Sequence, residues 1–152
     1  MWRSQSRIRQ EHGAALVELA LATPLLLILI VGVVDFARVF YLGMQVTDAA
    51  RAGAQYGSSP AVNFNATTTQ TRAQTASPQS APTIATPVEV CACVNDATAP
   101  TTLTAGACTA ACADHRTVFV SVTASKAFSP IMRFPGVPSS VTISRTVTLR
   151  RQ

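Results

Sequence analysis

The longest hydrophobic stretch of the chain covers residues 14–34. Glu18 is its only ionisable side chain, and residues 25–34 are aliphatic except for Gly32. A helix rises about 1.5 Å per residue, so this stretch would be roughly 31 Å long, close to the thickness of about 30 Å of a bilayer core. The pattern therefore predicts a transmembrane helix over residues 14–34, in which Pro24 is a tolerated kink.

The helical pattern continues beyond the apolar run. Residues 35–56 contain no proline, and their polar and apolar side chains recur at helical spacings. Gly57, followed by two serines and a proline, is a helix stop signal, and we expect this glycine to adopt a left-handed conformation. We therefore expect one continuous helix from Ala14 to Tyr56, with residues 35–57 projecting beyond the membrane.

The rest of the chain divides into a polar segment and a β-rich segment. Residues 58–87 are rich in Thr, Ser, Ala, Gln and Pro, which is typical of a linker, although the pattern allows a short helix over residues 65–76 with asparagine caps. Within residues 88–152 the hydrophobic period becomes two, and it predicts strands within residues 88–94, 118–123 and 141–149. A sheet of three strands needs a cover, so we expect an α+β fold with a small antiparallel sheet packed on the outer half of the long helix.

Composition excludes two classes of protein. Charged residues make up 12% of the chain and hydrophobic residues 48%, whereas an average soluble domain has about 25% charged residues. A chain this apolar is not intrinsically disordered, and a net charge of +5 is too dilute for a surface that binds nucleic acid. The excess of apolar residues instead fits a segment in contact with a lipid bilayer.

The charges around the apolar run predict its orientation. Arg3, Arg7 and Arg9 precede it, against the single acid Glu11. Because positive flanks stay in the cytoplasm, the N-terminus should be cytoplasmic and the residues after Asp35 should be periplasmic in a bacterial inner membrane. A cleaved secretory signal peptide is the alternative, but the run is longer than the usual apolar region of about 7–15 residues and no small-x-small site closes it.

Glu18 and Gly13 are the residues in this region that most need an explanation. A carboxylate inside an apolar helix costs about 2–3 kcal/mol to insert, and such residues are usually functional. In one interpretation Glu18 lies near the cytoplasmic interface and reaches water. In the other, a protease cuts after Gly13, Ala14 becomes a cationic N-terminus, and Glu18 of a neighbouring copy pairs with it inside the lipid.

The N-terminal motif resembles the processing site of type IV prepilins, in which a glycine precedes the cut and a glutamate is fifth after it. The wider N-terminal region resembles the signature of TadE-like proteins, the pseudopilins of the tight-adherence (Flp pilus) apparatus. The stretches that carry this resemblance are Gly13-Ala14-Ala15-Leu16-Val17-Glu18-Leu19-Ala20-Leu21, Pro24-Leu25-Leu26, Gly32, Asp35 and Ala49-Ala50-Arg51-Ala52-Gly53-Ala54, with a similar close over residues 118–122, 128–130 and 150–152.

The resemblance implies a structural role without catalysis or a cofactor. A prepilin peptidase would remove the cytoplasmic leader, residues 1–13, and the mature chain would have a pilin-like shape. Its partners would be other pilins or pseudopilins, inner-membrane pilus assembly proteins and the lipid bilayer. It would reside in the inner membrane or within an extracellular pilus. The alternative is a single-pass periplasmic binding or adaptor protein that is neither processed nor polymerised.

The four cysteines form a second candidate feature. Cys91, Cys93, Cys108 and Cys112 are even in number, and the expected compartment is oxidising, so disulfides are the first interpretation. Among the three pairings, we favour nested Cys91–Cys112 and Cys93–Cys108. A zinc site with four thiolates is the alternative, but the first two cysteines are closer in sequence than zinc ligands usually are.

The sequence contains no recognisable catalytic motif. His12 falls in the leader, and His115 follows Asp114 without a serine or cysteine placed beside it by a known pattern. We expect His115 to lie in a surface turn and the protein not to be an enzyme.

Overall fold

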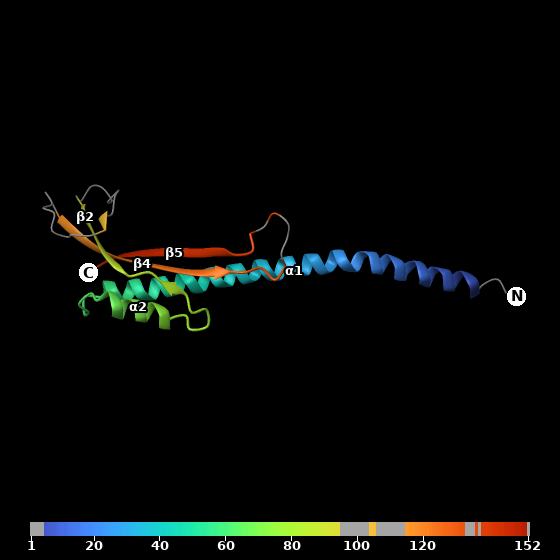
Figure 1. The fold of residues 1–152 in the computed structure, drawn as a ribbon, viewed down its shortest axis with the longest axis horizontal. Coiled ribbons are helices and arrows are strands. Elements are labelled where there is room, and N and C mark those ends of the chain that lie inside the picture. Colours follow the sequence, from blue (N-terminus) through green and yellow to red (C-terminus); the bar gives the residue numbers. More distant parts are fainter. Residues whose placement is uncertain (1–4, 95–103, 106–114, 133–135, 137, 152) are drawn as a thin grey trace.

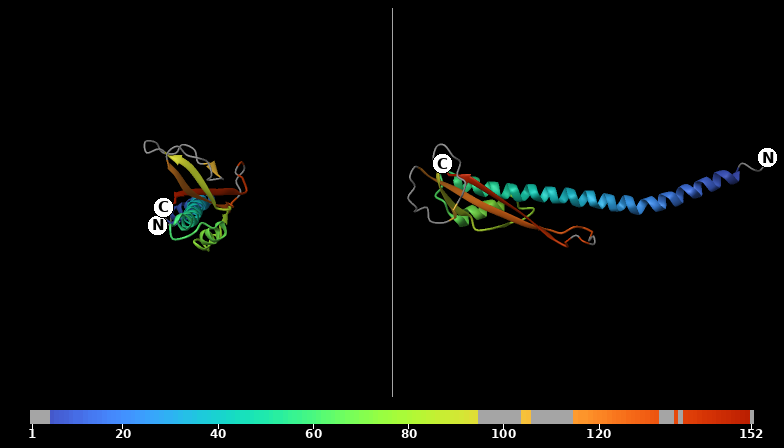
Figure 2. Two further views of the ribbon diagram at one scale, coloured as in Figure 1. Left: turned by 90° about the vertical axis from the view of Figure 1, so that its left-hand side faces the viewer. Right: turned by 90° about the horizontal axis from the view of Figure 1, so that it is seen from above.

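A single long helix and a small folded body make up the molecule (Figure 1). The computed structural model describes residues 5–94, 104–105, 115–132, 136 and 138–151. The N-terminal half of the helix projects alone, whereas its C-terminal half is covered by the sheet on one side and by a second, short helix on another (Figure 2). The expected fold class is confirmed: a long N-terminal apolar helix is followed by a small antiparallel sheet, in an α+β arrangement.

The long helix, α1 (Gln5–Ser58), is continuous and begins earlier than expected. It contains Pro24 and bends in its N-terminal half (Figure 2). Proline removes one backbone hydrogen bond and crowds the preceding turn, so a bend without a break is its usual effect in a long helix.

The end of α1 corrects one expectation from the sequence. Gly57 lies inside α1 and does not have a positive φ, which among the described glycines is found at Gly136 (φ 86°). The last turn is closed instead by Ser58, whose hydroxyl donates to the Gln55 carbonyl at 3.3 Å, and by Ser59, whose N–H donates to Tyr56 at 3.3 Å. The chain then leaves the helix at Pro60, which cannot donate an N–H to continue it.

The segment expected to be linker-like contains the second helix, α2 (Ala66–Thr75), which agrees with the predicted short helix. The Asn65 side chain caps it by accepting from the Thr68 N–H at 3.1 Å. Thr69 and Ala73 are buried. The segment is therefore packed against α1 and forms part of the body.

The sheet is antiparallel and has five strands in the described part of the chain. The strands are β1 (Thr83–Ile84), β2 (Val88–Val94), β3 (Thr104–Ala105), β4 (His115–Phe128) and β5 (Val141–Arg150). β4 is the centre, with β5 along one edge and β1 and β2 along the other, while β3 extends the sheet beyond β2.

The strand expectations are confirmed for β2 and β5 and extended for β4. β4 begins at His115, opposite Val94 of β2, so His115 lies in a strand and not in the expected turn, while Asp114 is outside the described residues. β1 and β3 are two residues long, which is too short to give a hydrophobic period.

The core lies where the outer half of α1 meets β4. Small residues on α1 face the alternate, inward-pointing residues of the strand, as the two periodicities predict. Partly buried Val147 and Leu149 of β5 border this core. The buried cluster consists of Val46, Ala49, Ala50, Ala54, Ala73, Ile84, Val120, Val122 and Ala124.

Candidate functional site

Residues 13–30 of α1 contain the predicted processing residues and are not covered by any other described part of the chain; we call them the bare segment. Every residue from 13 to 30 is exposed, including Ala14 and Glu18. A Cβ added at Gly13 would meet nothing within 4 Å. Glu18 forms no ion pair with any residue that the structure describes. Gly13, Ala14 and Glu18 thus lie within two turns of one helix, away from the folded body and accessible to other molecules.

This bare segment is also the apolar one. Within the described residues, α1 is the one helix that is long and apolar enough to cross a membrane, with a mean hydropathy of 2.6 over its most apolar window, none of which is buried. The exposed side chains there are large aliphatic ones, such as Leu21 and Leu25. Water is a poor solvent for so much apolar surface, and a lipid bilayer is a good one.

Asp35 marks the boundary between the bare segment and the folded body. The sequence places Arg38 three residues later, as in a solvated surface pair, but the structure buries Asp35 to 9% exposure. Its carboxylate accepts from the Ile131 backbone N–H, at 2.9 Å from Oδ2 and 3.2 Å from Oδ1, and from Arg38 Nη1 at 2.8 Å. The carboxylate therefore ties the segment after β4 to α1.

Arg38 strengthens the same junction from the other side. Its guanidinium lies 5.3 Å from the centre of the Phe128 ring, a cation–π distance. Phe128 ends β4 and is buried. We call Asp35, Arg38, Phe128 and Ile131 the junction cluster. It fixes the sheet to α1 at the point where the exposed apolar run ends, a role that the spacing of Asp35 and Arg38 alone does not reveal.

Two glycines let α1 approach its neighbours closely. A Cβ at Gly57 would lie 2.9 Å from Val120 Cγ1 and 3.2 Å from Thr69 Cγ2, and a Cβ at Gly53 would lie 2.8 Å from the Ala73 Cβ. These separations are shorter than van der Waals contact. The packing of α1 on β4 and α2 therefore requires glycine at both positions.

The far end of the body is closed by Arg151. Its guanidinium donates to Glu89 Oε1 at 2.6 Å and to the Val62 carbonyl at 3.1 Å, while its backbone N–H donates to Val118 at 2.8 Å. Charge-assisted hydrogen bonds of this kind are stronger than neutral ones. Arg151 thereby joins three segments that are distant in the sequence.

Cys91 and Cys93 lie on β2, on the opposite face to the buried residues Val90 and Ala92, as the alternation predicts. No described cysteine is free. Cys108 and Cys112 lie outside the described residues, so the pairing stays a prediction. The described residues hold no group of His, Cys, Asp and Glu suited to a metal ion.

Comparison with known proteins identifies the N-terminal region. Residues 13–55 match the family model of TadE-like proteins. Comparison with curated proteins and with solved structures gives no significant match. The matched segment contains Gly13, Ala14 and Glu18, the exposed apolar run and Asp35. The apolar helix and the family match together fit a membrane-anchored protein. The resemblance drawn from the sequence is thereby confirmed over residues 13–55: this segment is similar to TadE-like proteins, which suggests a protein associated with the Tad pilus.

Proposed function

We propose that the chain is a pseudopilin or minor pilin of tight-adherence pilus assembly, and that a prepilin peptidase shortens it to begin at Ala14. The observation that carries this proposal is the start of the family match at Gly13, the residue before the proposed cut. The residues that follow are exposed from Ala14 to Ile30, and none is buried up to Val34, as is needed for a helix that packs against lipid and other subunits.

Cleavage would supply a positively charged partner for the Glu18 carboxylate. An isolated carboxylate in lipid is unfavourable by about 2–3 kcal/mol, and Glu18 has no ion-pair partner among the described residues. The new α-amino group of Ala14 is cationic near neutral pH. Ala14 and Glu18 are separated by about 6 Å along the helix axis, so a parallel copy displaced by about one turn brings its amine beside this carboxylate.

The proposal assigns the chain a structural role. The leader, residues 1–13, would lie in the cytoplasm beside the peptidase, and the folded body would lie in the periplasm, because the arginines precede the apolar run. Its partners would be the peptidase, other pilins or pseudopilins and inner-membrane assembly proteins. No catalysis and no cofactor belong to this role.

Three variants test the proposal in cells that carry the whole apparatus. Gly13→Ala should keep the leader attached. Glu18→Gln should be processed but should enter the assembly poorly, because the buried amine has lost its partner. Glu11→Gln is the matched control, since it changes an acid that cleavage discards. Normal assembly by Glu18→Gln, or leader removal in Gly13→Ala, would refute the proposal.

The second candidate is a tethered adaptor that is neither processed nor polymerised. It is favoured by the separation between the two parts of the molecule, because the buried residues of α1 begin at Asp35 and none lies in residues 13–34. If α1 is only a tether, replacing residues 14–34 by another apolar helix of the same length preserves function. The pseudopilin proposal predicts loss of function for the same replacement.

The cysteines add a further proposal, that Cys91 pairs with Cys112 and Cys93 with Cys108. It is supported by the position of Cys91 and Cys93 on one face of β2, where both can meet one partner segment. A cross-link that closes a loop of about 15 residues stabilises a domain by about 3 kcal/mol. Peptide mapping without reduction should recover both bridges, whereas bound zinc with four free thiols would contradict them.

A further inference from the structure

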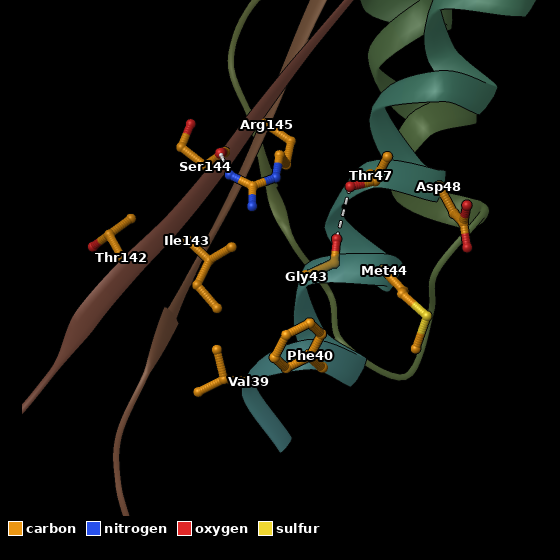
Figure 3. A pocket seen from close by; sticks show the side chains of 10 residues that line it. All are labelled: Val39, Phe40, Gly43, Met44, Thr47, Asp48, Thr142, Ile143, Ser144 and Arg145. Carbon is orange, nitrogen blue, oxygen red and sulfur yellow. Dashed lines mark hydrogen bonds between the residues drawn. The ribbon is translucent and has the colours of Figure 1, made fainter. Parts of the chain in front are cut away.

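A groove of about 710 Å³ runs between α1 and β5, beyond the apolar run (Figure 3). Val39 and Phe40 of α1 and Ile143 of β5 line one end of it, and Thr47 and Arg145 line the other (Figure 3). Gly43 lies between them and, because it has no side chain, leaves the middle of the groove open.

An apolar ridge on α1 borders this groove. Phe36, Phe40, Met44 and Asp48 follow one another at intervals of four residues, so they lie on one side of the helix. The first three are 64%, 59% and 57% exposed, and the rings of Phe36 and Phe40 are 4.6 Å apart. The ridge extends the apolar surface of the bare segment along the folded body. In a single copy of the chain, this part of the apolar surface would be in contact with water.

Two opposite charges stand at the outer end of the groove. Asp48 lies on the α1 wall and Arg145 on the β5 wall, and neither has an ion-pair partner among the residues that the structure describes. Among the described residues, the Arg145 guanidinium donates to the carbonyl of the adjacent Ser144, at 3.0 Å. Arg145 shares a face of β5 with Val147 and Leu149, which border the core.

The edge strand itself is poorly suited to a partner strand. β5 pairs with β4 along one edge, and an inward-pointing charge on an edge strand discourages a further strand from pairing with it. A helix can occupy the groove without using that edge, because helices pack by inserting ridges of side chains into grooves.

We propose that the groove receives the ridge of α1 from a second copy of this chain, in a parallel, two-fold dimer. This contact differs from the displaced one proposed for Ala14 and Glu18: here the two copies, anchored by the same apolar run, lie at the same depth, so that Phe40 and Met44 of the second copy meet the apolar end and its Asp48 meets Arg145. Two-fold symmetry repeats each contact, so the dimer contains two Asp48–Arg145 pairs. The inference requires that residues 14–34 lie in the membrane, but it does not require removal of the leader.

Charge reversal in trans tests this arrangement. Full-length chains fused to donor or acceptor fluorescent proteins are reconstituted in lipid vesicles, and association is measured by energy transfer. Asp48→Arg and Arg145→Glu should each weaken self-association about fivefold or more, because both pairs become repulsive. An equimolar mixture of the two variants should associate about as well as the wild type, since each mixed dimer has two complementary pairs.

Restored association in the mixture would show that Asp48 and Arg145 meet between two copies. If each substitution acted only within its own chain, mixing the two variants would not restore association. Arg150→Glu is the matched control, since it reverses a charge on the opposite face of β5 and should leave association unchanged. Wild-type chains that do not associate, or single variants that associate normally, would overturn the proposal. Loss of association without rescue in the mixture would overturn it too. All these readings are independent of leader processing.

Discussion

Gly57 and Gly53 determine how closely α1 approaches β4 and α2. At both positions the nearest side-chain atoms stand where a Cβ would go. The sequence alone suggests a different use for Gly57, because a glycine before two serines and a proline usually supplies a left-handed cap. Whether a glycine serves a turn or a close approach depends on what packs against it, and that information lies in β4 and α2, far along the chain.

Gly57→Ala should destabilise the folded body by about 1–3 kcal/mol, because the added methyl group overlaps Val120 and Thr69. Hydrogen exchange of the β4 amides in the detergent-solubilised chain measures the change. Gly32→Ala is the control, since nothing lies within 4 Å of its Cβ position. Equal protection in the two variants would show that the contact with β4 is not tight.

Asp35→Ala should release the segment after β4. The Ile131 N–H would lose its acceptor, and loss of a partly buried partner costs about 1–3 kcal/mol. Exchange at the Ile131 amide should therefore rise about tenfold or more, while the Val120 amide stays protected. Arg38→Ala should have a smaller effect, because its side chain is 48% exposed and exposed pairs contribute about 0–1 kcal/mol. A larger effect for Arg38→Ala would contradict this ranking.

At the scale of elements, the sequence predicted what local patterns encode. α1 follows from its apolar run and from the absence of proline in residues 35–56, α2 from its asparagine cap, and the three longer strands from alternation. β1 and β3 carry no period because they are so short. The partner of Asp35 was not predictable either, since it is a backbone amide almost a hundred residues away and no side-chain pattern marks it.

The cap of α2 gives a prediction of its own. Asn65→Ala removes the acceptor for the Thr68 N–H, so the free energy of unfolding should fall by about 1 kcal/mol. Exchange at the amides of α2 in the full chain reports the change. Asn63→Ala is the matched control, because Asn63 is exposed and precedes the cap. If the two variants exchange alike, the capping contact contributes nothing to stability.

At the scale of the whole molecule, α1 joins two different environments. Residues 13–34 are mostly apolar and none of them is buried, whereas the C-terminal half of α1 packs in the folded body, with the junction cluster at the boundary. The body is therefore joined to the segment that contains Gly13 and Glu18 by one continuous helix. In the proposed assembly, the placement of each helix in the lipid would therefore determine where its folded body lies outside the membrane.

The central claim is that the chain loses its leader, residues 1–13, and acquires a new N-terminal amine at Ala14. Mass spectrometry of the N-terminal peptide, from membrane-extracted protein of cells with an active prepilin peptidase, tests it most directly. The account predicts a chain that starts at Ala14. A chain that keeps residues 1–13 would contradict it, because Glu18 would then have no new amine to pair with.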